Sequence, residues 1–328
     1  MSTLPDRATD HVVGHVTDHV TDHVTGHVTD HLTDHLTDRA TDYVAGHLTR
    51  QITGRTALCA ILADPILHVK TPDAINNLLR DRGIDGVMVP MHVGPGELAR
   101  VVSGLRGIRN FVGFIATVPH KTSMAALCDD ISDRARAVGA VNVVRRTAGG
   151  QLVGDMFDGL GFTEGLRQAG IEPAGRSVYL AGAGGAASAI AFALVAAGVS
   201  LLTIANRTRA RTEALVERLA RQGSSVPIRI DDSGSDPSGH DIVVNGTSLG
   251  LHPGDPLPLD VSRLDAHQIV AEIIMNPETT PLLAAARARG CRIHPGWPML
   301  ACQLGMMADF MGLPAATDPS SAPGTSQR

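Results

Sequence analysis

The stretch from residue 177 to residue 205 constrains the fold of this chain more than any other part of it. Residues 177–181 are apolar and predict a buried strand, residues 182–187 are rich in glycine, and an alanine-rich run to residue 197 has helical character. Glycine suits such a turn because the backbone must bend sharply without a Cβ. A helix that begins there offers unpaired N–H groups and a positive dipole end to a phosphate. The pattern predicts a Rossmann unit that binds a dinucleotide through Gly182, Ala183, Gly184, Gly185 and Ala186.

The end of the second predicted strand, residues 201–205, distinguishes NAD from NADP. An NAD site carries an acidic residue there, which holds the ribose 2′-hydroxyl. This chain has Asn206, Arg207, Thr208 and Arg211 instead, with a further arginine at position 209. Guanidinium groups bind a phosphate in a bidentate manner, and no carboxylate repels it. We therefore predict NADP (NADPH when reduced) as the cofactor.

Composition excludes several other classes of function. A net charge of −5 and a pI near 6.3 give no electrostatic reason to expect a nucleic-acid partner. No apolar run reaches the length of about 20 residues that a membrane helix needs, so no membrane partner is expected. The four cysteines lack metal-site spacing, and the N-terminus lacks an apolar signal core. We expect a cytoplasmic protein without a bound metal, either a monomer or a homodimer.

A tetrapeptide repeat, Thr-Asp-His-Val with variations, occupies residues 9–53 and places histidines four residues apart. In a helix this spacing advances by about 40° per repeat, so the histidines would not share one face. We interpret residues 1–53 as a disordered low-complexity extension. A metal-binding role remains the alternative, because histidines at positions i and i+4 of a helix can ligate zinc.

The remainder of the chain alternates predicted strands with predicted helices, which indicates the α/β class. Expected strands are 57–62, 86–91 and 112–118, then 177–181, 201–205, 241–245 and 269–274; expected helices are 73–82, 95–105, 121–128 and 297–313. We predict two α/β domains with a cleft between them and a mainly parallel first sheet. The predicted domains are 54–157 for substrate, 158–293 for NADP, a helical segment 294–314 that returns to the first domain, and a disordered tail 315–328.

Hydride transfer to a ketone requires a group that places or protonates the carbonyl oxygen. A tyrosine site is disfavoured, because Tyr43 lies in the repeat and Tyr179 lies inside the first cofactor strand. A zinc site is disfavoured by the cysteine spacing. Lys121 remains, since it follows the predicted strand 112–118 at the edge where open α/β sheets bind ligands.

Several motifs in order resemble the shikimate dehydrogenase family between Cys59 and Gly312. Residues 64–68 and 71–72 are similar to its first substrate loop, 117–121 to its TxPxK motif and 139–142 to its GAVN motif. Residues 154–159 are similar to GDNTDG, and the glycine-rich turn, 206–208, 245–247, 276–277, 280–282 and 299–303 complete the series. The resemblance implies a two-domain NADP-dependent enzyme that oxidises a cyclic hydroxyl group.

The resemblance also implies roles for individual residues. Lys121 and Asp158 would form the catalytic pair that holds the substrate hydroxyl and assists proton transfer. Substrate-binding positions would be Val69, Thr71, Thr117, Asn142, Met275 and Gln303, and Asn245 and Thr247 would join the cofactor site.

Five positions depart from the family pattern and are aliphatic or aromatic where the family has polar or aromatic groups. They are Val69, Ile115, Met156, Phe157 and Met275. Each hydrogen bond lost to a substrate costs about 0.5–1.5 kcal/mol, so we expect weaker binding of a polyhydroxylated acid. Lys70 offers a charge that could meet the substrate carboxylate instead.

The leading hypothesis is an NADP-dependent oxidoreductase that interconverts a small cyclic hydroxy acid and its ketone, shikimate and 3-dehydroshikimate first among them. Quinate or another shikimate-like compound is the close alternative. A non-catalytic regulatory protein that binds NADPH or a metal is the alternative from another class, and the presence of both Lys121 and Asp158 argues against it.

Overall fold

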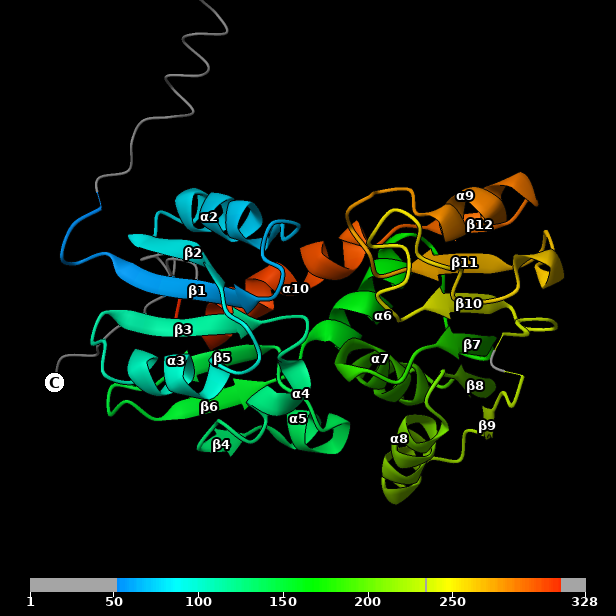
Figure 1. Cartoon of the computed structure of the whole chain (residues 1–328), viewed down its shortest axis with the longest axis horizontal. Coiled ribbons are helices and arrows are strands. Elements are labelled where there is room, and N and C mark those ends of the chain that lie inside the picture. Colours follow the sequence, from blue (N-terminus) through cyan, green and yellow to red (C-terminus); the bar gives the residue numbers. More distant parts are fainter. Residues whose placement is uncertain (1–51, 234, 314–328) are drawn as a thin grey trace, which may run out of the picture. The chain divides into compact units, whose positions relative to one another are not determined.

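A computed structural model describes residues 52–233 and 235–313 of the chain. The predictions for the histidine-rich repeat and for the C-terminal tail lie outside these residues. The described chain forms two six-stranded sheets, each covered by helices (Figure 1). The expected two-domain α/β class is confirmed.

The first sheet has the strand order β2-β1-β3-β5-β6-β4. Its strands are β1 (Ala57–Ala63), β2 (Gly86–His92), β3 (Phe111–Ala116), β4 (Asp130–Ile131), β5 (Val143–Arg146) and β6 (Leu152–Asp155). The accompanying helices are α2 (Thr71–Asp81), α3 (Leu98–Leu105), α4 (Lys121–Met124) and α5 (Asp133–Val138).

Side chains that alternate along β1 divide the core of this sheet in two. Ala60 and Leu62 face α3 and α5, whereas Cys59 and Ile61 face α2 and the C-terminal helix α10 (Trp297–Phe310). The period of two in a strand explains why one β-strand serves both layers. Burial on both faces also explains why β1 is apolar throughout.

The prediction of a mainly parallel first sheet is confirmed, with β5 as the one strand that runs against the other five. β5 pairs antiparallel with both β3 and β6. Two four-residue strands joined by a short turn at Thr147–Gln151 pair locally as a hairpin, and no crossover helix separates them. Expected bounds also differ: β3 ends at Ala116, α4 ends at Met124 and α3 begins at Leu98.

The second sheet is parallel throughout, with the order β12-β11-β10-β7-β8-β9 of a Rossmann domain. Its strands are β7 (Ser177–Ala181), β8 (Leu201–Ala205), β9 (Ile228–Ile230), β10 (Ile242–Asn245), β11 (Ile269–Glu272) and β12 (Arg292–His294). Its helices are α6 (Asp158–Gln168), α7 (Gly185–Ala196), α8 (Arg209–Arg221), the short η1 (Val261–Arg263) and α9 (Pro281–Ala288). The bounds predicted for β7 and β8 are confirmed.

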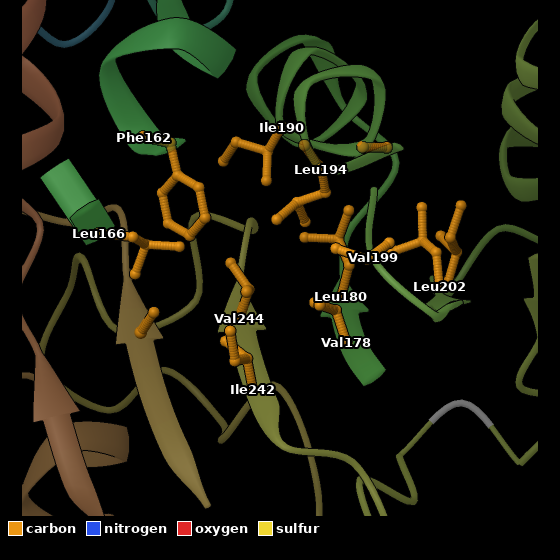
Figure 2. Close-up of a cluster of buried hydrophobic side chains, with 14 of the residues drawn as sticks. Phe162, Leu166, Val178, Leu180, Ile190, Leu194, Val199, Leu202, Ile242 and Val244 are labelled. Atoms are coloured by element: carbon orange, nitrogen blue, oxygen red, sulfur yellow. The ribbon is translucent and has the colours of Figure 1, made fainter. Parts of the chain in front are cut away.

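A large apolar cluster fills the space between this sheet and helices α6, α7 and α8. Figure 2 shows Phe162 and Leu166 of α6 and Ile190 and Leu194 of α7 above the strand residues, with Leu180 among them. Tyr179 and Ala181, which alternate with Leu180, belong to the opposite cluster beneath α9. Helix α7 can therefore be apolar around most of its surface, because it is packed on several sides.

Close helix packing holds α6 against α7. A β carbon at Gly159 would lie 2.2 Å from the carbonyl oxygen of Ala189, so only glycine fits there. α6 also packs against α10, where a β carbon at Gly161 would lie 2.3 Å from the carbonyl oxygen of Met299. The start of α6, at Asp158, is thereby fixed from two sides.

No helix in the part of the chain that the structure describes is long and apolar enough to cross a membrane.

Candidate active site

A cleft of about 1190 Å³ is lined by residues of both sheets and their helices. Its wall contains most of the residues predicted for function: Val69, Thr71, Thr117, Lys121, Asn142, Asp158, Gly182, Ala183, Gly184, Gly185, Ala186, Asn206, Arg207, Arg211, Thr247, Met275 and Gln303. The fold thus brings the predicted catalytic, substrate and cofactor residues together although they span most of the described chain.

Lys121 and Asp158 form an ion pair at the inner end of this cleft. Lys121 begins α4, just after β3, and Asp158 is the first residue of α6. Nζ of Lys121 donates to Oδ2 of Asp158 at 2.5 Å, and the two side chains are 14% and 3% exposed. The positive end of the α6 dipole favours the Asp158 carboxylate. The pair is therefore placed by two helix starts and shielded from water.

Asn142 connects the pair to the C-terminal helix. Its Nδ2 donates to Oδ1 of Asp158 at 2.8 Å and to Oε1 of Gln303 at 3.1 Å. Its Oδ1 accepts from the backbone N–H of Phe157 at 2.9 Å, which fixes the residue before α6. Asn142 and Gln303 are almost fully buried. Hydrogen bonds between buried polar groups restrict their geometry, which is what a reaction site requires.

The glycine-rich turn lies directly beside the catalytic lysine. A β carbon at Gly185, the first residue of α7, would lie 3.0 Å from Cβ of Lys121 and 3.5 Å from Cβ of Ala140. Gly182 has a φ of 120°, and a β carbon there would lie 2.9 Å from the backbone of Gly246. Glycine is thus required at Gly182 and leaves close room for Lys121 at Gly185, and the open N-terminus of α7 is a suitable place for a pyrophosphate.

The arginine cluster after β8 lies at the outer end of the cleft. Arg207 and Arg211 are exposed and contribute to its wall. Arg209 pairs with Glu213 at 2.8 Å and with Asp232, which raises the pKa of its guanidinium. Two of the three arginines are therefore available to an anionic group of the cofactor.

Two residues predicted at the cofactor site are outside the cleft wall. Thr208 is the exposed N-cap residue of α8, and its carbonyl oxygen accepts from Nδ2 of Asn206 at 3.0 Å. Asn245 is fully buried at the end of β10. Its side chain forms hydrogen bonds with Glu272 and with the loop after β10. Asn245 therefore supports residues of the cleft wall without lining the cleft itself.

The five departures from the family pattern separate into two groups. Val69, Ile115 and Met275 line the cleft. Met156 and Phe157 pack in the two apolar clusters of the first sheet, where Phe157 contacts Phe310 with ring centroids 5.8 Å apart. The expectation that all five reduce the polarity of the substrate site was wrong for these two, because their side chains turn into the core.

Lys70 does not offer its charge to the cleft. It is exposed, occupies the N-cap position of α2 and is outside the cleft wall, unlike its neighbours Val69 and Thr71.

Several cleft residues were missed by sequence reasoning. His68 lines the wall, and burial together with the nearby His252 lowers the pKa of its imidazole. Arg218 reaches the wall from the last turn of α8 and donates to Oγ of Ser188 at 3.3 Å. His68 precedes two predicted substrate positions, so its place in that loop was a usable signal. No signal in the sequence pointed to Arg218, because a helical arginine outside any motif resembles a surface residue.

Comparison with known proteins agrees with this arrangement. Residues 61–144 match the model of the shikimate dehydrogenase substrate-binding domain, and residues 166–250 match that of shikimate/quinate 5-dehydrogenase. The shikimate dehydrogenase (NADP(+)) of Rubrobacter xylanophilus is 42% identical over 255 residues, which are 77% of this chain and 89% of that protein.

Solved structures show the same architecture. The shikimate 5-dehydrogenase of Thermus thermophilus, in complex with NADP(H) and shikimate, has a TM-score of 0.69 at 30% identity and covers 81% of this chain and 96% of its own. The 5-ketofructose reductase of a Gluconobacter strain has a TM-score of 0.68 at 31% identity and covers 79% of this chain and 94% of its own. The sequence, the fold and the buried Lys121–Asp158 pair agree, and the chain belongs to the shikimate dehydrogenase family.

Proposed function

We propose that this chain is an NADP-dependent oxidoreductase that interconverts a cyclic hydroxy acid and its ketone, with shikimate and 3-dehydroshikimate as the pair. The supporting observation is the Lys121–Asp158 ion pair, which lies against the first residue of α7 in a shared cleft. The resemblance to NADP-dependent relatives supports the same cofactor.

The cofactor site suits a dinucleotide with a 2′-phosphate. The pyrophosphate would bind at the N-terminus of α7, where even a β carbon at Gly184 would have no atom within 4 Å, so that the backbone there is open to a ligand. Arg207 and Arg211 would hold the 2′-phosphate. The bound NADPH would supply the hydride.

Lys121 and Asp158 would manage the proton. In the direction of reduction, the Lys121 ammonium would donate a proton to the carbonyl oxygen of the ketone, which would become the hydroxyl group of the alcohol. Asp158 accepts one hydrogen bond from the ammonium at 2.5 Å, and the other N–H groups of Lys121 would serve the substrate. In the reverse direction the neutral amine accepts the hydroxyl proton. Burial of the pair makes these interactions stronger than they would be in water.

Asn142, Gln303, Thr71 and Thr117 would bind the other polar groups of the substrate. The neighbouring wall at Val69, Ile115 and Met275 is apolar. Each missing hydrogen bond weakens the binding of a polyhydroxylated acid by about 0.5–1.5 kcal/mol. We therefore expect a high KM for shikimate, and quinate belongs in any substrate panel.

The compartment and the assembly follow as further parts of this proposal. The cysteines Cys59, Cys128, Cys291 and Cys302 are unpaired, which suits the reducing cytoplasm. We expect the enzyme to work as a monomer or a homodimer.

The test is an initial-rate assay of NADP reduction with shikimate, quinate and a panel of cyclic hydroxy acids. Turnover of shikimate that is lost in Lys121→Ala and is much slower with NAD supports the proposal. Tight NADPH binding without turnover of any acid would contradict it and would favour a regulatory role.

A further inference from the structure

Glu272, the last residue of β11, is a buried carboxylate that the proposed mechanism does not use. Its side chain is fully shielded from water, and it is absent from the cleft wall. A buried carboxylate is costly unless it is hydrogen-bonded. Four donors surround this one: the N–H groups of the first two residues after β11, the side chain that ends β10 and the hydroxyl that caps α9.

One oxygen of Glu272 holds the loop that follows β11. Oε1 accepts from the backbone N–H of Ile273 at 2.8 Å and from that of Ile274 at 3.1 Å. The same loop continues through Met275 and Asn276, and all four residues line the cleft. Glu272 therefore fixes the start of the loop that carries the predicted substrate position Met275.

The other oxygen reaches the loop that follows β10. Oε2 accepts from Nδ2 of Asn245 at 3.1 Å, and Oδ1 of Asn245 accepts from the N–H of Thr247 at 3.0 Å and from its hydroxyl at 2.7 Å. Nδ2 of Asn245 also donates to the carbonyl oxygen of Leu249 at 3.0 Å. Residues 246–249 line the cleft on the cofactor side. Glu272 is thus bonded, through Asn245, to the second loop as well.

The same oxygen accepts from the hydroxyl of Thr280 at 2.9 Å. Thr280 caps α9 and lies at the far end of the first loop, after residue 279. The carboxylate therefore holds the first loop at both of its ends.

The direction of three of the four hydrogen bonds to Glu272 is determined. Two of the donors to Glu272 are backbone N–H groups, which cannot accept. Asn245 cannot reverse its amide, because its oxygen already accepts from Thr247. Both oxygens of Glu272 must therefore accept, Oε1 from two backbone N–H groups and Oε2 from Asn245, and a carboxylate meets this requirement.

Burial raises the pKa of Glu272, and its four hydrogen bonds act in the opposite direction. None of the four partners carries a positive charge. These neutral dipoles therefore offset only part of the effect of burial on the pKa of Glu272.

We propose that Glu272 is a positioning residue that couples the substrate loop (residues 273–276) to the cofactor loop (residues 246–249). It holds both loops in the relative placement that binds cofactor and substrate together. The inference rests on the proposed function, because that function assigns the two loops to substrate and NADP.

The first test is Glu272→Gln, which keeps the shape and replaces one acceptor by a donor. Whichever way the amide turns, it meets at least one N–H donor of the network. We expect kcat/KM for the hydroxy acid to fall about tenfold to a hundredfold and the Kd of NADPH to rise about tenfold, because one buried partner is lost and two loops are released. The two constants should change together.

Gln268→Glu is the matched control. Gln268 is the residue just before β11 begins, and it is as fully buried as Glu272. Its side-chain amide donates to the carbonyl oxygens of Pro237 at 2.9 Å and His240 at 2.8 Å. The substitution reverses the polarity of a network that is absent from the cleft wall. Gln268→Glu should lower the free energy of unfolding about as much as Glu272→Gln does. It should leave the KM for the hydroxy acid and the Kd of NADPH unchanged in the folded protein.

Glu272→Asp provides the second variant. It retains two acceptor oxygens on a side chain that is one methylene group shorter, so it cannot reach both loops equally well. We expect a smaller change in the same two constants. Values within twofold of the wild type in both Glu272 variants, or equal changes in Gln268→Glu, would overturn the proposal.

The Kd of NADPH is measured by the fluorescence of the bound nicotinamide, without turnover. If no hydroxy acid is converted by the wild type, the proposed function fails. The coupling of the loops is then still tested by the Kd of the two Glu272 variants.

Discussion

The two ends of the cleft hold charged groups in opposite ways. At the inner end, the side chains of Lys121 and Asp158 are 14% and 3% exposed and have fixed partners. At the outer end, Arg207 and Arg211 lie on the surface, and the Arg209 side chain is 64% exposed. Water and salt screen exposed charges but have little effect on buried ones. The inner end therefore depends on geometry, whereas the outer end depends on electrostatic attraction.

Removal of the Lys121 amine should have the largest effect, because it removes the proton-transferring group at the inner end of the cleft. Lys121→Ala is expected to lower kcat by about 10²–10⁴, because the group that donates and accepts the proton is lost. The Kd of NADPH should stay near that of the wild type, since the arginines and the turn are unchanged. Steady-state rates and a fluorescence titration measure the two quantities. A variant that loses cofactor binding as well would show that the two ends are not separate.

The geometry of the inner end should also depend on helix packing. In Gly159→Ala the new methyl group would lie 2.2 Å from the carbonyl oxygen of Ala189, so α6 must move and carry Asp158 with it. We expect a loss of up to about 3 kcal/mol in the free energy of unfolding, measured in urea.

Gly104→Ala in α3 is the control for this substitution. A β carbon there has no atom within 4 Å, and the change should stabilise the helix by about 0.5–1 kcal/mol. If Gly159→Ala unfolds at the urea concentration of the wild type, close packing does not fix α6.

At the outer end we expect a smaller effect that depends on the cofactor. Arg211→Ala should raise KM for NADP about tenfold and leave KM for NAD unchanged, because only NADP has the 2′-phosphate. Arg209→Ala is the matched comparison. Arg209 is already paired with Glu213 and Asp232, so its loss should matter less. Equal effects on NADP and NAD would exclude a phosphate clamp at Arg211.

Added salt should separate the two ends without any substitution. KM for NADP is expected to rise as ionic strength increases, because the exposed arginines are screened. The value of kcat should change little, since the Lys121–Asp158 pair is shielded. Initial rates at saturating and subsaturating NADP measure both constants. If kcat changed with salt while the KM for NADP stayed constant, the inner end of the cleft, and not the outer end, would depend on screened charges.

The smallest effect that we expect is on the pH dependence of stability, and it comes from a buried histidine outside the reacting groups. Burial and the nearby Arg292 lower the pKa of His294, and its Nε2 has no hydrogen-bond partner. Below the usual pKa of about 6.5 the unfolded chain binds the proton more readily, so stability should fall as the pH decreases from 7. Urea unfolding at several pH values measures this slope. His294→Gln should flatten it, and an unchanged slope would assign it to other groups.

Local signals in the sequence predicted the cofactor half of the site well. The turn at residues 182–187 and the strands on both sides of it occur where they were expected, because glycine and apolar runs determine local backbone conformation. Lys121, Asp158, Asn142 and Gln303 were identified through the resemblance. Their mutual hydrogen bonds join residues that are up to 161 positions apart, as between Asn142 and Gln303.

Burial was less accessible to sequence reasoning. Met156 and Phe157 occupy a family motif and looked like pocket residues, yet they pack in the core. Asn245 looked like a cofactor contact, but it supports the wall from behind through Glu272. Which way a side chain points depends on the elements that pack around it, and the short strands β4, β5 and β6 gave no clear periodic signal.

The sequence by itself determined the α/β class, the dinucleotide turn and the types of residue that can perform the chemistry, because these depend on local backbone preferences and on side-chain chemistry. The tertiary structure decided which departures reach the cleft, which arginines are free and how Glu272 joins two loops. These properties depend on contacts between distant segments, and such contacts exist only once both sheets and their helices have packed.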